Sequence, residues 1–264
     1  MNNNRTLPRE LQEVLAPYTP LQNEIGRSTA AVFRYQNAEE TLYLKIQKAD
    51  DEIQAEHAIL RWAAGRIPVP AVRFYQEFQG VAYLLMTAVK GHMSFLNEEG
   101  GISSRHENTV SALSEGLLAL QKVDIRDCPF DGRLSIKLEK ARRRVEQGLV
   151  DVEDFEESSP FSTAEALYEY LSNNKPREEL CFTHGDYCLP NIFMEGNRLT
   201  GFIDMGRAGI ADKWQDIALC VRSLRYNLQR AGEKNYYTNL LFDKLCIEPD
   251  EDKIRYYILL DDLF

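Results

Sequence analysis

Two aspartates and one asparagine stand at short intervals in one stretch of the sequence, Cys181 to Arg207. Asp186 ends an H-G-D triplet, Asn191 comes five positions later, and Asp204 follows the apolar segment G-F-I. Carboxylate and amide oxygens are the ligands that Mg²⁺ prefers, and a carboxylate can orient a hydroxyl group and accept its proton. Phosphoryl transfer combines these two tasks. The spacing therefore predicts that Asp186 acts on the acceptor hydroxyl while Asn191 and Asp204 hold Mg²⁺.

The elements around these residues are predicted to be a strand, a loop and a hairpin. A short apolar strand precedes His184, Gly196 and Asn197 form a turn, and a second strand ends at Ile203. His184 is expected to brace the backbone of the loop. This order resembles the H-R-D-x-x-x-x-N and D-F-G elements of protein kinases. A single aspartate in a turn is often only a good turn residue, but the joint pattern H-G-D-x₄-N with I-D-x-G favours catalysis.

A lysine for a nucleotide phosphate is expected in the first third of the chain. Residues 41–46 alternate as a strand, so Tyr43 and Lys45 share the face opposite the apolar residues. The following helix, Asp50 to Ala64, carries Glu56 on its apolar side, where a carboxylate needs a partner. We expect Lys45 and Glu56 to form an ion pair that holds the lysine at ATP. The alternative is a solvent-exposed lysine at a sheet edge.

Two further segments are candidates for nucleotide contacts. Residues 25–33 have the placement of a loop that covers a nucleotide, where Ser28 offers a hydroxyl group or a backbone N–H to a phosphate. An ordinary hairpin turn explains this stretch equally well. A buried strand, Val81 to Thr87, runs into a hinge, where the backbone of Thr87 and Val89 is expected to face the adenine.

Composition limits the class of partner. The chain has 264 residues with 31 Lys and Arg against 41 Asp and Glu, a net charge of -10. This charge argues against nucleic acid and anionic membranes as partners and favours a cationic small molecule. An N-terminal apolar segment is absent, so we expect a cytoplasmic protein. Five widely spaced cysteines are expected to be reduced thiols: Cys128, Cys181, Cys188, Cys220 and Cys246.

The order of elements predicts an α+β fold with two lobes. Residues 1–88 are expected to form a small nucleotide-binding lobe with an antiparallel sheet and one key helix. Residues 89–264 are expected to form a larger, mostly helical lobe with the catalytic and substrate sites. Two S-x-x-E sequences predict capping boxes, at which helices begin near Ser104 and Ser162.

Carboxylates gather in two places outside the catalytic stretch. The run from Asp151 to Glu157 is acidic, as is the apolar end of the chain, which reads Y-Y-I-L-L-D-D-L-F. Most acidic runs are solvated loops. Beside a phosphoryl-transfer site, however, they could bind a polycationic acceptor.

Several motifs together resemble the aminoglycoside 3'-phosphotransferases, bacterial antibiotic-resistance kinases. They are H-G-D-Y-C-L-P-N, G-F-I-D-M-G-R-A-G-I-A-D-K-W-Q-D-I-A, L-Y-L-K at Lys45, R-I-P-V-P and the ending Y-Y-I-L-L-D-D-L-F. The resemblance covers nearly the whole chain. It implies a bilobal protein-kinase-like fold and ATP with two Mg²⁺ as cofactors. It also implies transfer of the γ-phosphate to the 3'-hydroxyl of drugs such as kanamycin, a reaction that confers resistance to them.

The resemblance also implies roles for single residues. Asp186 matches the catalytic base, and Asn191 and Asp204 match the metal ligands. Lys45 and Glu56 match the nucleotide ion pair, Tyr43 matches the aromatic residue stacked on adenine, and Ser28 matches the serine of the nucleotide loop. The residues that match or border the antibiotic site are Glu156, Glu157, Arg207, Arg222, Tyr226, Asp261, Asp262 and Phe264.

Two rival functions share these motifs. A kinase for another small alcohol, such as choline, homoserine or a sugar, would also carry H-G-D-x₄-N. A non-catalytic binding module with this fold would usually have lost Lys45, Asp186 or Asp204, and all three are present. An enzyme is therefore the favoured class.

Overall fold

The structure is a computed structural model of the chain. It describes residues 7–21, 30–94, 102–155, 159–228 and 231–264. The chain divides into two compact units, an N-terminal unit of residues 1–89 and a C-terminal unit of residues 90–264. The expected boundary lies at residue 88, one position earlier. The functions expected of the two lobes stay predictions.

The N-terminal unit is built on one antiparallel sheet. Its five strands have the order β1-β2-β3-β5-β4. The elements of this unit are α1 (Arg9–Leu15), β1 (Thr19–Leu21), β2 (Ala31–Gln36), β3 (Thr41–Lys48), α2 (Asp51–Ala63), β4 (Val72–Phe78) and β5 (Val81–Thr87).

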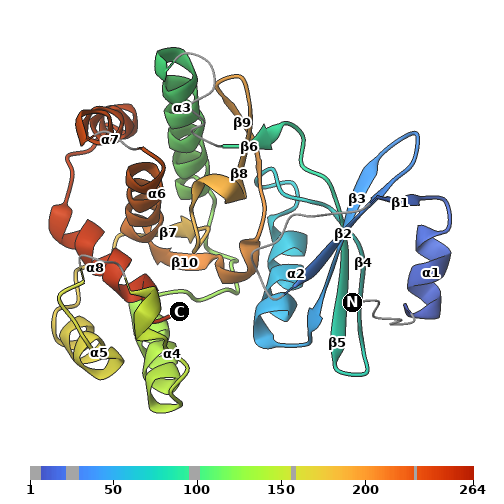
Figure 1. Ribbon diagram of the computed structural model, residues 1–264, viewed down its shortest axis with the longest axis horizontal. Helices are drawn as coiled ribbons and strands as arrows, with labels where there is room; N and C mark the ends of the chain where they lie inside the picture. The colour runs from blue at the N-terminus through green and yellow to red at the C-terminus, as the bar shows by residue number, and fades with distance from the viewer. Residues whose placement is uncertain (1–6, 22–29, 95–101, 156–158, 229–230) are drawn as a thin grey trace. The chain divides into compact units, whose positions relative to one another are not determined.

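Strand β3 shows why the sheet has two different faces. Leu42, Leu44 and Ile46 are buried and pack with Leu11 and Leu15 of α1, as the alternation predicts. The intervening side chains of β3 point to the other face, where α2 packs on β4 and β5. Figure 1 shows α1 and α2 on opposite sides of the sheet.

Helix α2 begins where the sequence places a cap. The side chain of Asp50 accepts a hydrogen bond of 3.0 Å from the N–H of Ile53 and so satisfies one free donor of the first turn. Gly65, with a φ of 79°, follows the end of the helix. The helix buries Ile53, Leu60 and also Glu56.

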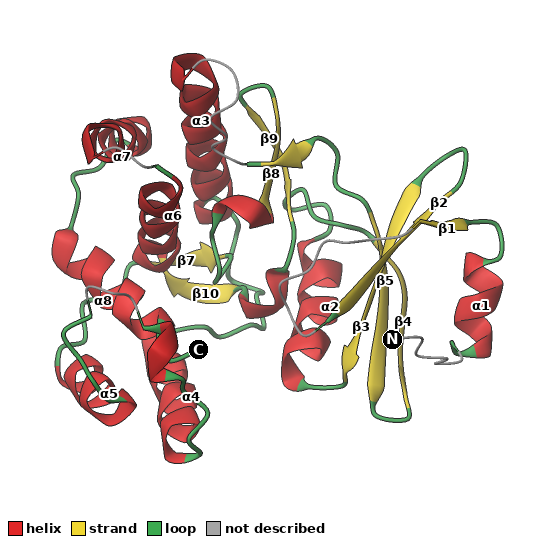
Figure 2. Cartoon of the chain, in the orientation of Figure 1, coloured by secondary structure: helices red, strands yellow, loops and turns green. Residues whose placement is uncertain are grey.

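The C-terminal unit is mostly helical (Figure 2). Its two small sheets have the orders β10-β7 and β6-β8-β9. The elements are β6 (His92–Met93), α3 (Ile102–Gln121), α4 (Leu134–Glu146), η1 (Val152–Asp154), α5 (Ala164–Asn173), β7 (Leu180–Thr183), η2 (Leu189–Asn191), β8 (Ile192–Glu195), β9 (Arg198–Phe202), η3 (Met205–Arg207), β10 (Gly209–Asp212), α6 (Lys213–Asn227), α7 (Ala231–Leu245) and α8 (Glu251–Asp261). The two units together confirm the predicted α+β class.

Both predicted capping boxes are misplaced. Helix α3 already begins at Ile102, so Ser104 lies inside the helix. At α5 the cap is Thr163, one residue after Ser162, and its hydroxyl accepts a bond of 3.2 Å from the N–H of Ala166. Serine and threonine both cap helices, so at α5 the neighbouring Ser162 and Thr163 were both candidates.

Within the described residues, no helix is both long and apolar enough to cross a lipid bilayer. All five cysteines lie in the described part of the chain, and none is joined to another.

Candidate active site

The H-G-D triplet lies in a loop that a buried carboxylate holds by its backbone. Strand β7 ends at Thr183, and the N–H groups of His184 and Gly185 then donate hydrogen bonds of 2.6 and 2.9 Å to the two oxygens of Asp216. Asp216 lies in the first turn of α6 and is only 2% exposed. Burial raises the pKa of its carboxyl group, while the two backbone N–H donors lower it. The backbone before Asp186 is thereby fixed to α6.

His184 braces the loop, as expected. Its Nδ1 accepts a hydrogen bond of 3.3 Å from the N–H of Asp186, so the ring proton belongs on Nε2, which lies 2.9 Å from the carbonyl oxygen of Ile203. The ring is completely buried. Because Ile203 directly precedes Asp204, one neutral imidazole links the two aspartates of the motif.

The side chain of Asn191 reaches Asp186. Its Nδ2 donates hydrogen bonds of 2.9 Å to Asp186 Oδ2 and 3.0 Å to the Asp186 carbonyl oxygen. Its backbone oxygen accepts a bond of 3.0 Å from the N–H of Ile203. With the amide nitrogen turned to Asp186, the amide oxygen of Asn191 points away from that carboxylate. The structure therefore brings Asp186, Asn191 and the segment before Asp204 together.

Asp204 stands at the tip of a tight turn after β9. It is exposed and has a left-handed backbone, with φ 60° and ψ 50°, directly before η3. Left-handed backbone is uncommon for residues other than glycine and clusters at functional sites. Together Asn191 and Asp204 offer an amide oxygen and a carboxylate, a donor set that suits Mg²⁺. No group of three or more His, Cys, Asp or Glu side chains forms a metal site among the described residues.

Gly185 allows the loop to pass close to η3. Its φ is 85°, and a Cβ atom at this position would collide with the backbone oxygen of Arg207. On the other side of the loop, the hydroxyl group of buried Tyr187 donates a bond of 2.7 Å to Leu113 of α3. Burial and the neighbouring Asp186 raise the pKa of the Cys188 thiol to about 12, so Cys188 stays protonated at neutral pH.

The N-terminal unit contains the predicted ion pair. Lys45 Nζ lies 2.8 Å from Glu56 Oε2, with the two side chains 15% and 3% exposed. The pair joins β3 to α2 on the face of the sheet opposite the α1 core. Glu56 thus has the partner that its burial requires, and the edge-lysine alternative is wrong.

The other expected nucleotide residues are placed only in part. Tyr43 is half-buried on the same face of β3 as Lys45. At the end of β5, Thr87 donates its N–H to the carbonyl oxygen of Ala71 at 3.0 Å, and its hydroxyl accepts the N–H of Ala71 at 2.9 Å. These bonds fix the strand end before Val89. That adenine binds there stays a prediction, and Ser28 lies outside the described residues.

The residues predicted at the substrate site differ in their surroundings. Asp261 Oδ2 accepts a bond of 2.6 Å from Arg222, and Asp261 Oδ1 lies 3.6 Å from Arg207 Nη1. Three of the predicted residues therefore form one cluster. Asp262 and Phe264 are half-buried next to it in sequence, whereas Tyr226 is 83% exposed. Glu156 and Glu157 lie outside the described residues.

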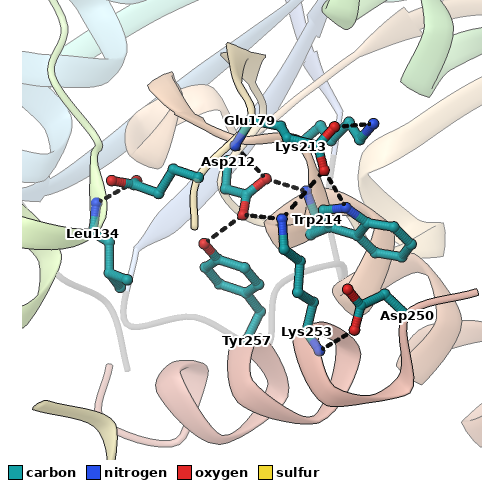
Figure 3. Close-up of polar contacts among 9 residues, drawn as sticks. Leu134, Glu179, Asp212, Lys213, Trp214, Asp250, Lys253 and Tyr257 are labelled. Atoms are coloured by element: carbon teal, nitrogen blue, oxygen red, sulfur yellow. Dashed lines mark hydrogen bonds and ion pairs between the residues drawn. The ribbon is translucent and has the colours of Figure 1, made fainter. Parts of the chain in front are cut away.

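A polar network attaches α8, which ends at Asp261, to the strands that carry the loop (Figure 3). Asp212, 1% exposed at the end of β10, accepts the N–H groups of Glu179 and Trp214 at 3.2 Å. Its other oxygen accepts Tyr257 Oη at 2.9 Å and Lys253 Nζ at 3.3 Å. One carboxylate thus joins the start of β7, the N-terminus of α6 and one face of α8.

Glu179 extends this network at the surface. It lies 2.7 Å from Lys213 Nζ and 3.2 Å from Lys253 Nζ, and it accepts Trp214 Nε1 at 3.0 Å (Figure 3). The hydrogen bond from Lys213 is the main reason that the pKa of Glu179 is lowered to about 2.

The sequence prediction missed the role of Asp216. The available signal was a carboxylate in the helix that also carries Trp214, Ile217 and Ala218, all buried. A buried carboxylate requires donors. Which donors it uses was not predictable, because they are backbone N–H groups about thirty residues earlier in the chain.

Comparison with known proteins connects this geometry to a family. The model of the phosphotransferase enzyme family matches residues 21–257. The chain belongs to the phosphotransferase enzyme family. It is 37% identical over 262 residues to an aminoglycoside 3'-phosphotransferase of Enterococcus faecalis, covering 97% of each chain.

Solved structures of phosphotransferases match the fold over nearly the whole chain. The crystal structure of an aminoglycoside 3'-phosphotransferase of type VIII matches with a TM-score of 0.82 and 29% identity, over 97% of each chain. The aminoglycoside phosphotransferase APH(3'')-Id of Streptomyces rimosus, solved with ADP and streptomycin, matches with a TM-score of 0.77 and 26% identity, over 96% of this chain and 95% of that one. The kinase-like fold expected from the motifs is confirmed.

Proposed function

We propose that this protein transfers the γ-phosphate of ATP to the 3'-hydroxyl group of aminoglycoside antibiotics and so confers resistance to them. The observation that carries the proposal is the joined loop of Asp186, Asn191 and Asp204, in a chain with full-length similarity to aminoglycoside 3'-phosphotransferases. The relative solved with ADP and streptomycin supports a nucleotide and an aminoglycoside as the two ligands.

In this proposal Asp186 accepts the proton of the attacking hydroxyl group. Asn191 donates to Asp186 Oδ2, which leaves Oδ1 to orient the hydroxyl and take up its proton as the new oxygen–phosphorus bond forms. His184 and Asp216 keep the carboxylate in place through the backbone. Neither residue needs to touch the substrate.

Asn191 and Asp204 are the proposed ligands of Mg²⁺. The amide nitrogen of Asn191 donates hydrogen bonds to Asp186, so the side-chain amide oxygen is the atom that would bind a hard cation. The metal supplies neutralisation of the phosphate charge when it is bound. The residues present therefore fit the cation that the family's chemistry requires.

The N-terminal unit is the proposed ATP-binding part. Lys45, held by Glu56 at 2.8 Å, provides a fixed positive charge for the phosphates of ATP. Tyr43 is proposed to stack on adenine, whose edge meets the backbone of Thr87 and Val89. Ser28 is proposed to contact a phosphate.

The proposed aminoglycoside site is acidic, because the substrate carries several ammonium groups. Carboxylates around the acceptor hydroxyl attract and orient such a substrate. Arg207 and Arg222 hold Asp261 and thereby shape the site. The other residues proposed to contact or border the antibiotic are Glu156, Glu157, Tyr226, Asp262 and Phe264.

A substrate panel tests the proposal. Purified protein with Mg²⁺ and ATP is incubated with kanamycin A, with tobramycin, which lacks the 3'-hydroxyl group, and with choline, and ADP release is measured. We expect turnover of kanamycin A alone. Turnover of choline alone would assign the protein to the small-alcohol kinases, and efficient turnover of tobramycin would exclude the 3' position as the required acceptor.

A further inference from the structure

Helix α4 places two cations beside the last residues of the chain. Lys137 and Arg144 are seven positions apart and therefore lie on one face of the helix. Lys137 Nζ and the Arg144 guanidinium carbon each lie 6.0 Å from the centre of the Phe264 ring. The intervening Arg143 differs, since it is 65% exposed and its ion pair is with Glu139 on the same helix.

Arg144 binds the backbone of two separate segments. Its Nε donates a bond of 2.8 Å to the carbonyl oxygen of Leu263. Its Nη2 donates bonds of 3.0 Å to the backbone oxygen of Phe264 and 3.1 Å to that of Leu149. The planar guanidinium group can make these bonds together because its donors have a fixed fork geometry. One side chain thus joins the turn at residues 261–264 to the segment that begins at Leu149.

Both joined segments lead into residues proposed to bind the substrate. Asp261, Asp262 and Phe264 belong to the first segment, and the acidic run from Asp151 to Glu157 follows Leu149 by two positions. The bond to Leu263 spans 119 residues and is a tertiary link, whereas the bond to Leu149, five residues along the chain, is a local contact beyond the end of α4. Movement of either segment relative to α4 requires these bonds to break.

Lys137 adds an electrostatic link on the same face of α4. Burial lowers the pKa of Lys137 to about 8, while the charges of Asp261 and Asp216 act in the opposite direction. Lys137 therefore lies within the field of the carboxylate in the turn and of the carboxylate that holds the catalytic loop. Lys137 and Arg144 thus present two positive charges on the face of α4 that lies next to Phe264.

We propose that Arg144 is a positioning residue for aminoglycoside recognition, holding the turn at residues 261–264 and the segment after Leu149 in register with each other. The proposal rests on the proposed function. Arg144 acts through backbone carbonyl oxygens, so its loss displaces the acids of the site and leaves the Asp186 loop, which Asp216 holds, in place. Substitution of Arg144 should therefore raise the KM for the antibiotic and leave the KM for ATP unchanged.

The test compares Arg144→Gln with Arg143→Gln, a matched change of the exposed neighbour on the same helix. We expect Arg144→Gln to raise the KM for kanamycin A about tenfold, the size of effect when charge-assisted hydrogen bonds are lost, with the KM for ATP within about twofold. Arg143→Gln is expected to behave as the wild type. Equal KM values for kanamycin in all three proteins would overturn the proposal.

A second background separates positioning from general destabilisation. In a protein that ends at Leu260, the turn that Arg144 holds is missing, so Arg144→Gln should change kcat/KM for kanamycin less than about twofold. The same tenfold loss in both backgrounds would show that Arg144 does not act through the turn at residues 261–264 and would overturn the proposal.

If Arg144→Gln does not fold, the Arg144→Lys variant tests the proposal in its place. Lysine keeps the charge but lacks the fork, so a raised KM for kanamycin with unchanged KM for ATP supports the proposal and a wild-type KM overturns it. Wild-type turnover of kanamycin reports separately on the proposed function. A wild-type enzyme that phosphorylates only another alcohol refutes that function, whatever the variants do.

Discussion

The catalytic loop and the turn at Asp261 are both held by charged side chains from other elements, but in different ways. The loop is held by Asp216, which is 2% exposed and binds two backbone N–H groups. The turn is held at Asp261 by Arg222 and Arg207, whose side chains are 26% and 36% exposed. Buried bonds are hardly screened by salt, whereas exposed ion pairs are. The loop of the proposed chemistry is therefore held by buried bonds, and the proposed substrate site is held by solvent-accessible charges.

The largest effect is expected at the loop itself. Asp186→Ala removes the group that accepts the hydroxyl proton, and kcat should fall by about 10³-fold or more, while ATP still binds because Lys45 and Glu56 are untouched. Steady-state kinetics and nucleotide titration measure the two quantities. Near-wild-type turnover in the variant would remove Asp186 from the mechanism and break the distinction between a catalytic loop and a binding turn.

The second-largest effect is expected at Asp216, the buried carboxylate that holds the loop. Asp216→Asn keeps the shape of the side chain but removes the charge that binds two N–H groups, so the loop should shift and kcat should fall roughly 10²-fold. Because the site is buried, this loss should be the same at 0.05 M and 0.5 M salt. A loss that appears in KM for the antibiotic instead of kcat would show that Asp216 does not act through Asp186.

The substrate side should give a smaller, salt-dependent effect. Asp261→Asn leaves Arg207 and Arg222 without their shared carboxylate next to a polycationic substrate. The KM for kanamycin should rise about threefold to tenfold at low salt, and the difference from wild type should shrink at high salt. Asp252→Asn, at an exposed acid in the first turn of the same helix, is the control. A salt-independent increase would mean that the two anchors do not differ.

The smallest effect, on stability, is expected at Glu179 in the polar network between the loop and α8. The folded-state pKa of Glu179 is about 2, below its ordinary value of 4.5, so its stabilising contribution is complete above pH 4.5 and is lost as the pH falls toward 2. Glu179→Gln should lower stability by less than about 1 kcal/mol at pH 7, because this carboxylate is exposed. The gap in Tm between wild type and variant should close as the pH falls from 5 to 2. A gap that widens on acidification would contradict this assignment.

Sequence reasoning succeeded where a residue and its partner are close in the chain. Alternation on β3 placed Lys45 opposite the apolar core, and the apolar stripe of α2 placed Glu56 eleven positions later where it meets the lysine. The loop, hairpin and Asp204 were predictable because H-G-D-x₄-N and I-D-x-G fix local turns. The cap at Ser162 failed because the adjacent Thr163 takes the same role, and the cap at Ser104 failed because α3 already begins at Ile102.

Distant anchors could not be predicted in the same way. Asp216 binds backbone groups about thirty residues away, and Arg144 binds the backbone oxygens of Leu263 and Phe264. Every residue has such backbone groups, so residue type carries no signal about which of them is the partner. The pairing of Asp261 with Arg207 and Arg222 was hidden for a related reason. The charge of Asp261 predicts that it attracts a cation, but not whether that cation belongs to the substrate or to the chain.

The position of the transferred phosphate tests the central claim most directly. Kanamycin A is converted by the wild-type protein with Mg²⁺ and ATP, and the product is examined by phosphorus–proton correlation NMR. The account predicts a single phosphomonoester whose phosphorus couples to the proton on carbon 3'. A product phosphorylated at any other carbon, or no phosphorylated kanamycin at all, would contradict it.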